Sequence, residues 1–315
     1  MLWLTVTISF YFISAAVFLV DKYLLTSSIP NPKFYTFYVG TLGILFLIFI
    51  PFVGFYVPSF FQIILALLAG AIFIYALFWF YKSLSLFEAS RVVPAISGLV
   101  PLFTFFFVYI SSLGKDVLPP LGIIAFILLV LGSILIVAEK EKFINLKSLK
   151  ISIVCALLLS LSFTLSKYVY LNQSFWNGFI WIKLGGVITA ACFFLLEKDI
   201  RKEIFKKKNN FKVEKNLLSG GIKKYKTAII FLSNQVGGAT ANVLQNFAFA
   251  LAPLAYIAVI NALQGVQYIF LLILTILISL KFPQIIKEEI SKRVILQKGL
   301  AILLIVAGLA FLAFK

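Results

Sequence analysis

The sequence predicts an all-α integral membrane protein, on the basis of its composition, its hydropathy and the length of its apolar runs. Of the 315 residues, 62% are hydrophobic and only 12% are charged. Soluble domains contain about 45–50% apolar and about 25% charged residues. The mean hydropathy is +1.08, and apolar runs of about 20 residues, the length of a transmembrane helix, recur along the whole chain. Lipid must therefore be the solvent for most side chains.

Ten apolar runs are long enough to cross a bilayer as helices, because an α-helix rises about 1.5 Å per residue. Turn residues or charged residues separate them. The expected spans are 2–25, 34–57, 60–82, 86–111, 117–138, 150–171, 176–196, 226–250, 254–280 and 294–314. The segment 197–226, between the seventh and eighth spans, is long, polar and basic, which is typical of a solvated loop that meets anionic headgroups.

The two halves of the chain, residues 1–140 and 141–315, share a pattern of five spans each. Aligning Lys22 with Lys167 also aligns Tyr23 with Tyr168, and each half closes with a glycine-containing apolar span, LGIIAFILLVLGSILIV or KGLAILLIVAGLAFL. Because five is odd, consecutive copies must enter the membrane from opposite sides, which produces a 5+5 inverted-topology repeat. Such a repeat lets one half rock against the other, so the pattern favours a secondary transporter that works by alternating access.

Two blocks of sequence lie at corresponding places in the halves: ALFWFYKSLSLFEASRVVPAISGLVPLF and NVLQNFAFALAPLAYIAVINALQGVQYIF. Each is followed by a charged turn and a glycine-bearing span. In this order of segments the chain resembles the EamA family of the drug/metabolite transporter superfamily over essentially its whole length. The resemblance implies a ten-helix transporter of small organic metabolites. The chain departs from the common pattern because its second span has no arginine and its loop after the seventh span is unusually long and basic.

Composition excludes several other classes of function. The chain has no histidine, which excludes His-containing catalytic triads and His-based metal sites. Cys155 and Cys192 lie inside apolar segments without partner spacing, so small buried side chains are the better interpretation than a metal site or a disulfide. No phosphate-binding loop of the G-x-x-x-x-G-K-[ST] type occurs. We therefore expect no enzymatic activity, no cofactor and no metal.

The formal net charge of +17 could suggest nucleic acid as a partner. Of the 28 Lys and Arg residues, however, 24 lie in or beside the odd-numbered loops, where anionic lipid attracts them, and only Lys115 lies in an even-numbered loop. We expect a small-molecule substrate and the lipid bilayer as partners, no nucleic acid, and a monomer or homodimer. By the positive-inside rule both termini lie outside, whereas the family resemblance implies that both lie inside.

Polar side chains recur on one face of several spans at intervals of three or four residues. Polar groups in lipid need a partner and tend to face the protein interior or a water-filled path. One interpretation is a substrate-binding wall, and the other is hydrogen bonding between helices. The candidates are Ser97 and Thr104 in the fourth span, Asn234, Asn242, Gln245 and Asn246 in the eighth, and Asn261, Gln264 and Tyr268 in the ninth.

Two lysines lie within spans. Lys183 is seven residues beyond Trp176, about 10 Å along the helix, and a lysine at such a depth costs about 3 kcal/mol on insertion scales. Its side chain could snorkel to the interface, face a cavity as an anion contact, or pair with an acid of another span. Lys167 lies closer to a helix end, so snorkelling is the expected outcome there.

Helix-bending residues and acids complete the prediction. Pro94 and Pro101 should bend the fourth span, and Gly265 is the nearest interruption in the ninth; interruptions at corresponding places in two repeats point to a substrate site. Asp21 and Glu88 lie near span ends, and the second half has no acid within a span.

The lack of a central acid, together with Lys183, favours a neutral or anionic solute such as an amino acid or organic acid. The alternatives are a multidrug or cationic-compound exporter, a flippase for lipid-linked head groups, and a non-transporting scaffold or receptor. The Lys-rich composition fits the plasma membrane of a prokaryote.

Overall fold

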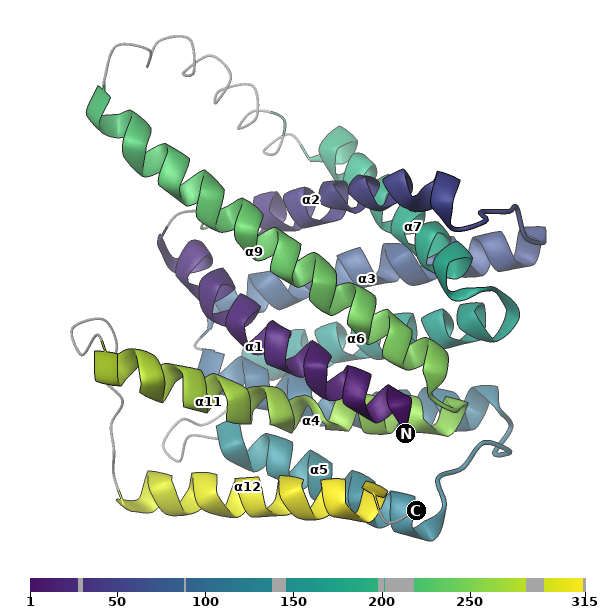
Figure 1. Cartoon of the computed structure of the whole chain (residues 1–315), viewed down its shortest axis with the longest axis vertical. Coiled ribbons are helices and arrows are strands. Elements are labelled where there is room, and N and C mark those ends of the chain that lie inside the picture. Colours follow the sequence, from purple (N-terminus) through teal and green to yellow (C-terminus); the bar gives the residue numbers. More distant parts are fainter. Residues whose placement is uncertain are drawn as a thin grey trace.

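The computed structural model describes residues 1–27, 31–87, 89–137, 146–197, 201, 218–281 and 292–313. Over these residues the chain is all-helical and contains no strand (Figure 1). The prediction of an all-α protein is confirmed. The expected boundary between the halves at 140/141, residue Glu88 and most of the basic segment 197–226 lie outside the described residues.

The helices follow the expected spans closely. In chain order they are α1 (Leu2–Ser27), α2 (Pro32–Leu42), the 3-10 helix η1 (Gly43–Phe52), α3 (Phe60–Leu86), α4 (Ala89–Ser111), α5 (Pro120–Val137), α6 (Leu146–Asn172), α7 (Phe175–Leu196), α9 (Leu218–Leu251), the 3-10 helix η3 (Leu254–Tyr256), α10 (Ile257–Ala262), α11 (Gln264–Lys281) and α12 (Lys292–Ala313).

Eight helical segments in the described part of the chain are long and apolar enough to cross a membrane, as in a multi-pass membrane protein. The predicted spans at α4 and α9 are not among these eight. In α4 the apolar stretch found among the residues that the structure describes is the shorter one, Ala95–Ser111. Helix α9 is 34 residues long and includes the amides Asn234, Asn242, Gln245 and Asn246, which we call the α9 stripe. Polar side chains of this kind lower the hydropathy of a helix.

The helices run side by side, and α1 begins and α12 ends at the same end of the bundle (Figure 1). We call this the terminal end. At the opposite end α1 ends and α2 begins, and there Lys33 Nζ lies 2.7 Å from Glu197 Oε2. We call this the basic end, because in the sequence the basic odd-numbered segments follow helices, such as α1, that end there.

Three pairs of helices form the framework: α3 packs against α6, α1 against α9, and α5 against α12. Helix α3 also packs against α7, and glycines bring these two helices into backbone contact. A Cβ atom on Gly70 would lie 1.8 Å from the carbonyl oxygen of Ile182, and one on Gly185 would lie 2.2 Å from that of Leu67. Any larger residue would force the helices apart. We call this contact the α3–α7 seam.

The second span changes from α-helix to 3-10 helix at Gly43 and ends at Phe52, five residues before the predicted end. Two features of the sequence explain the early end. Pro51 has no backbone N–H to continue a helical ladder, and Gly54 adopts a positive φ of 63°, which favours glycine. The last part of this segment is therefore a turn rather than a helix.

The ninth span is interrupted, but not at the predicted residue. Helix α10 ends at Ala262 and α11 begins at Gln264, so the break lies at Leu263, two residues before Gly265. Gly265 serves close packing instead, because a Cβ atom there would lie 2.5 Å from Ser133 Oγ. Helix α4 runs from Ala89 to Ser111 through both Pro94 and Pro101. The bend at these prolines stays a prediction.

The carbonyl groups around the break in the ninth span are hydrogen-bonded to side chains of other helices. The hydroxyl of Tyr11 donates to the carbonyl of Ile260 over 2.8 Å. The hydroxyl of Ser133 donates to that of Ala262, also over 2.8 Å. Irregular backbone at membrane depth is stable only when protein groups satisfy it in this way. The interruption is thus supported by both α1 and α5.

Candidate functional site

A cavity of about 310 Å³ lies inside the bundle. Its wall includes residues of α1, α2, α3 and α4 from the first half and of α6, α7, α9, α10 and α11 from the second. We call it the main cavity. Its size falls at the lower end of the range for small-molecule sites, about 300–1,000 Å³. Both halves of the chain therefore line a space large enough for a small solute.

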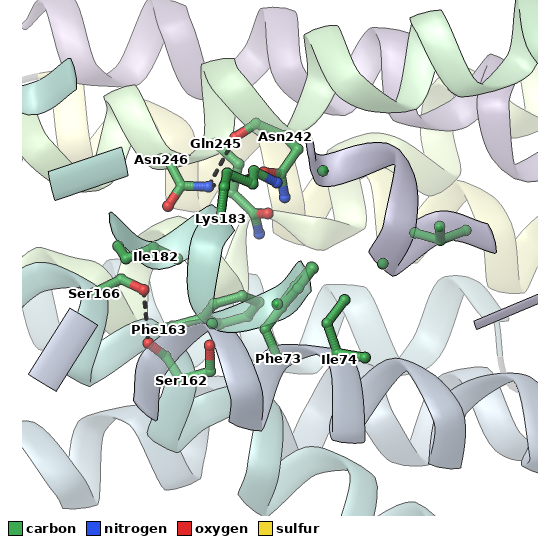
Figure 2. Close-up of a pocket in the computed structure, with 15 residues that line it drawn as sticks. Phe73, Ile74, Ser162, Phe163, Ser166, Ile182, Lys183, Asn242, Gln245 and Asn246 are labelled. Atoms are coloured by element: carbon green, nitrogen blue, oxygen red, sulfur yellow. Dashed lines mark hydrogen bonds between the residues drawn. The ribbon is translucent and has the colours of Figure 1, made fainter. Parts of the chain in front are cut away.

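Most of the polar residues singled out from the sequence line this space. Those in the wall of the main cavity are Lys183, Asn234, Asn242, Gln245, Asn261, Gln264 and Tyr268. Asn246 lines a smaller pocket of about 50 Å³, which shares Lys183, Asn242 and Gln245 with the main cavity (Figure 2). Ser97 and Thr104 are fully buried on α4 and belong to neither wall.

Lys183 lies inside the protein and points toward α9. Its Nζ donates a hydrogen bond to Oδ1 of Asn242 over 2.6 Å, and Figure 2 shows the lysine side chain reaching the amides of the α9 stripe. The aromatic rings of Phe46 and Phe179 each lie 5.0 Å from Nζ, within the range of a cation–π contact. Within the described ranges no carboxylate pairs with it. Of the three alternatives for Lys183, the structure places it on the cavity.

The amides of α9 differ in how much of their hydrogen-bonding capacity is already used. Asn246 donates to the carbonyl of Asn242 over 2.9 Å and accepts from the hydroxyl of Tyr170 over 2.8 Å. Gln245, one residue away on the chain, has no side-chain hydrogen bond to the residues that the structure describes, and it lines both pockets. Asn246 therefore joins helices, while Gln245 is available to a ligand.

Four of the other candidate residues are hydrogen-bonded to one another in two pairs. Asn261 donates to Oγ1 of Thr104 over 2.9 Å, which fixes the interrupted ninth span on α4. Gln264 donates to the hydroxyl of Tyr268 over 3.0 Å, one turn along α11. Thr104 thus forms a hydrogen bond between helices, which was the second interpretation of the polar residues, and not part of a substrate-binding wall.

Asp21 also forms part of the cavity wall, a role that its position near the end of a span does not predict. Its Oδ1 accepts hydrogen bonds from the hydroxyl of Tyr35 and, over 2.6 Å, from Nδ2 of Asn234. Tyr35 is fully buried and packs edge-to-face on Tyr81, with the ring centroids 4.7 Å apart. This cluster ties the end of α1 to the start of α2 and to α9. The spacing of single spans cannot reveal it, because each member comes from a different helix.

Lys167 does not snorkel, so that expectation was wrong. Its side chain is 3% exposed, and its Nζ donates to the carbonyls of Ala250, over 3.2 Å, and Ala252, over 2.6 Å. These carbonyls lie at the carboxyl end of α9, where helices leave carbonyl groups without partners and where a positive charge is favourable. Lys167 therefore caps α9 from α6.

No family model matches the sequence, and no curated protein matches it. The structure is similar to that of a protein solved by crystallography. The TM-score is 0.62 over 98% of this chain and 96% of that chain, at 15% sequence identity. At such low identity the similarity shows a shared fold and nothing about substrate. The chain therefore has the fold of a solved protein along nearly its full length.

Proposed function

We propose that the protein is a secondary transporter, which moves a small organic solute across the plasma membrane of a prokaryote by alternating access. The observation that carries the proposal is the main cavity, with Lys183 in its wall among apolar helices. A lysine at this depth is costly when, as among the residues that the structure describes, no carboxylate pairs with it, and intramembrane charges of this kind typically mark a substrate path. Gln245 adds an unused amide to the same wall.

Ten membrane crossings are part of the proposal. Helix α9 has 34 residues, about 51 Å at the helical rise, which exceeds the hydrocarbon thickness of about 30 Å. Helix α4 has 23 residues, also enough to cross. Adding α4 and α9 to the eight apolar segments gives ten. A chain that crosses the membrane an even number of times begins and ends on the same side. This agrees with the structure, in which the first turn of α1 and the last turn of α12 both lie at the terminal end (Figure 1).

The packing of the helices supports an inverted repeat. If α1 to α5 correspond in order to α6, α7, α9, the η3–α10–α11 segment and α12, then the α3–α6 pair corresponds to the α9–α1 pair. The α5–α12 pair corresponds to itself. All three are extensive contacts in the structure, as expected of a pseudo-two-fold axis. We propose membership of the EamA family on this arrangement and on the two sequence blocks.

One pair of corresponding contacts differs between the halves, which supports alternating access. Helices α3 and α7 are sealed by the glycine seam. Their counterparts α9 and α2 meet through aromatic rings, with Phe231 5.8 Å from Tyr35 and 6.0 Å from Tyr38 between centroids. A transporter that alternates would close the second contact when it opens the first. The structure thus fits one of two such states.

The positive-inside rule places the basic end in the cytoplasm, and we adopt this orientation. A neutral or anionic metabolite is the favoured cargo because of Lys183. A multidrug exporter, a lipid-linked head-group flippase and a non-transporting scaffold or receptor are the competing functions.

Ligand binding gives the first test of this function. A ligand that binds the folded state raises its stability by RT ln(1 + [L]/Kd), about 2.7 kcal/mol at one hundred times Kd. Purified protein is screened by thermal shift against amino acids, organic acids, sugar phosphates, nucleosides and amine drugs. We expect a hit with an anionic group, lost in Lys183→Gln and kept in Lys115→Gln, whose lysine is exposed in the α4–α5 loop. Hits confined to amine drugs and unaffected by Lys183→Gln would favour the multidrug exporter. No hit in any class would favour the flippase or the scaffold.

A further inference from the structure

The main cavity contains two side chains of opposite charge. Lys183 comes from α7 and Asp21 from the end of α1, and both lie in the wall of the same space. In the part of the chain that the structure describes, neither forms an ion pair, since the ion pair found there is the one between Lys33 and Glu197. The two charges also do not pair with each other. Each therefore lacks a counter-ion of its own within the described residues.

Both groups have hydrogen-bonding capacity left for a ligand. An ammonium group has three donors, and Asn242 uses one of those on Lys183. On Asp21 the Oδ1 atom accepts both hydrogen bonds, from Tyr35 and Asn234. The other carboxylate oxygen of Asp21 has no hydrogen bond to a described residue. A buried charge is stabilised when a group of opposite charge compensates its lost hydration, so each of these two side chains favours a ligand group of the opposite charge.

The spacing of the two asparagines that are hydrogen-bonded to these groups limits the length of the ligand. Lys183 is hydrogen-bonded to Asn242, and Asp21 is hydrogen-bonded to Asn234. These two asparagines are eight residues apart on α9, about 12 Å along its axis. In an α-amino acid the ammonium and carboxylate groups are attached to the same carbon. Such a molecule is too short to contact both Lys183 and Asp21 directly. A solute that touches both must hold its charges several bonds apart.

The wall of the main cavity also includes apolar side chains. Val39 and Leu42 of α2 and Phe73, Leu77 and Phe80 of α3 contribute to it. Methylene groups buried against such a wall are favourable by about 0.8 kcal/mol each. The chemistry of the cavity is thus cationic at one site, anionic at another and apolar over much of the remaining surface.

From this we infer that the cargo is an extended zwitterion, with an anionic group on Nζ of Lys183, an ammonium group on the free oxygen of Asp21 and an apolar chain between them. This inference rests on the proposed transport function and narrows its substrate class. It adds a cationic end to the neutral or anionic solute favoured by the sequence, because that expectation left Asp21 out of the site. Gln245 supplies an additional donor at the anionic end.

The test uses ω-amino acids of increasing length on the full-length protein in detergent. The probes are glycine, γ-aminobutyrate, ω-aminohexanoate, ω-aminooctanoate and ω-aminoundecanoate, with hexanoate and hexylamine as single-charge controls. Affinity, measured by calorimetry and thermal shift, should peak at an intermediate length. The best ω-amino acid should bind about ten- to a hundredfold more tightly than either control, the gain of one charge-assisted hydrogen bond. Equal affinity for the single-charge probes, or no dependence on length, overturns the inference.

Two variants assign the ends of the ligand. In Asp21→Asn the preferred ω-amino acid should lose its advantage over hexanoate, and in Lys183→Gln it should lose its advantage over hexylamine. Asp116→Asn and Lys115→Gln change the same residue types at exposed positions of the α4–α5 loop and serve as matched controls. A variant that keeps the wild-type length profile contradicts the role given to that side chain. The wild-type length series stands as a test even if a variant does not fold.

Flux measurements separate this inference from the proposed function. Length-dependent binding without any uptake into proteoliposomes would support the ligand class and contradict transport. Uptake of hexanoate at the same rate as every ω-amino acid would support transport and contradict the zwitterion.

Discussion

Nζ of Lys183 on α7 lies 2.6 Å from Oδ1 of Asn242 on α9. This hydrogen bond joins the seventh predicted span to the eighth across the wall of the main cavity. Asn242 thereby holds the ammonium group inside the protein, where Phe46 and Phe179 face it. The ammonium group therefore lies at the wall of the main cavity.

Replacing Lys183 by Gln should separate binding from stability. We expect ligand affinity to fall at least about tenfold, because a charge-assisted hydrogen bond contributes about 1.5–3 kcal/mol. The melting temperature should stay the same or rise, since the variant no longer buries a charge that pairs with no carboxylate in the described part of the chain. Calorimetry and thermal melting measure the two effects. A loss of several degrees in melting temperature at unchanged affinity would show that Lys183 has a structural role instead.

The α3–α7 seam should not tolerate a side chain. Gly185→Ala places a Cβ atom against the Leu67 carbonyl, and overpacking of this kind costs about 1–3 kcal/mol. Gly299→Ala on α12 is the matched control, because a Cβ atom there meets nothing within 4 Å. Denaturant unfolding in detergent should show a clear loss for Gly185→Ala and little change for Gly299→Ala. Equal stability of the two variants would contradict the close contact.

Lys167 should contribute to stability through the end of α9. Lys167→Met removes hydrogen bonds to the carbonyls of Ala250 and Ala252, and the expected loss is about 1–3 kcal/mol, as for an unsatisfied buried acceptor. Lys82→Met is a suitable control, since that lysine contacts the aromatic rings of Phe78 and Trp79 rather than the carbonyls at a helix end. Thermal unfolding measures both. An unchanged melting temperature in Lys167→Met would mean that the lysine does reach the interface.

The orientation predicts which face of the membrane a reagent reaches. If the basic end is cytoplasmic, a cysteine in place of Lys115 lies outside the cell. With Cys155 and Cys192 replaced by serine, a membrane-impermeant maleimide should label Lys115→Cys in intact cells. Labelling that requires permeabilised cells would reverse the orientation and agree with the topology implied by the EamA resemblance.

Hydropathy alone was enough to predict the all-α class and the approximate position of the helices, because lipid imposes long apolar runs. The helical spacing of amides predicted a shared face on α9, and Asn234, Asn242 and Gln245 do line one cavity. Spacing shows that residues share a face, but not which neighbour that face meets. For this reason Thr104 was grouped with the cavity although it bonds Asn261.

The remaining differences arise from contacts between distant segments. The interaction of Asp21 with Tyr35 and Asn234 requires three helices to converge, and no single span carries a signal for it. Lys167 was expected to snorkel because its distance from a helix end is visible in the sequence, whereas the open carbonyls of α9 beside it are not. The helix break at Leu263 likewise depends on Ser133 and Tyr11, which satisfy the neighbouring carbonyls from other helices.

Solute counterflow is the most direct test that the main cavity carries a transported molecule. Proteoliposomes are loaded with an excess of the unlabelled solute that best stabilises the protein, and entry of the labelled solute is followed over time. We expect transient accumulation with wild-type protein and with Lys115→Gln, and at least about tenfold slower accumulation with Lys183→Gln. If the solute binds but its labelled form enters no faster than into protein-free liposomes, the main cavity does not carry a transported molecule.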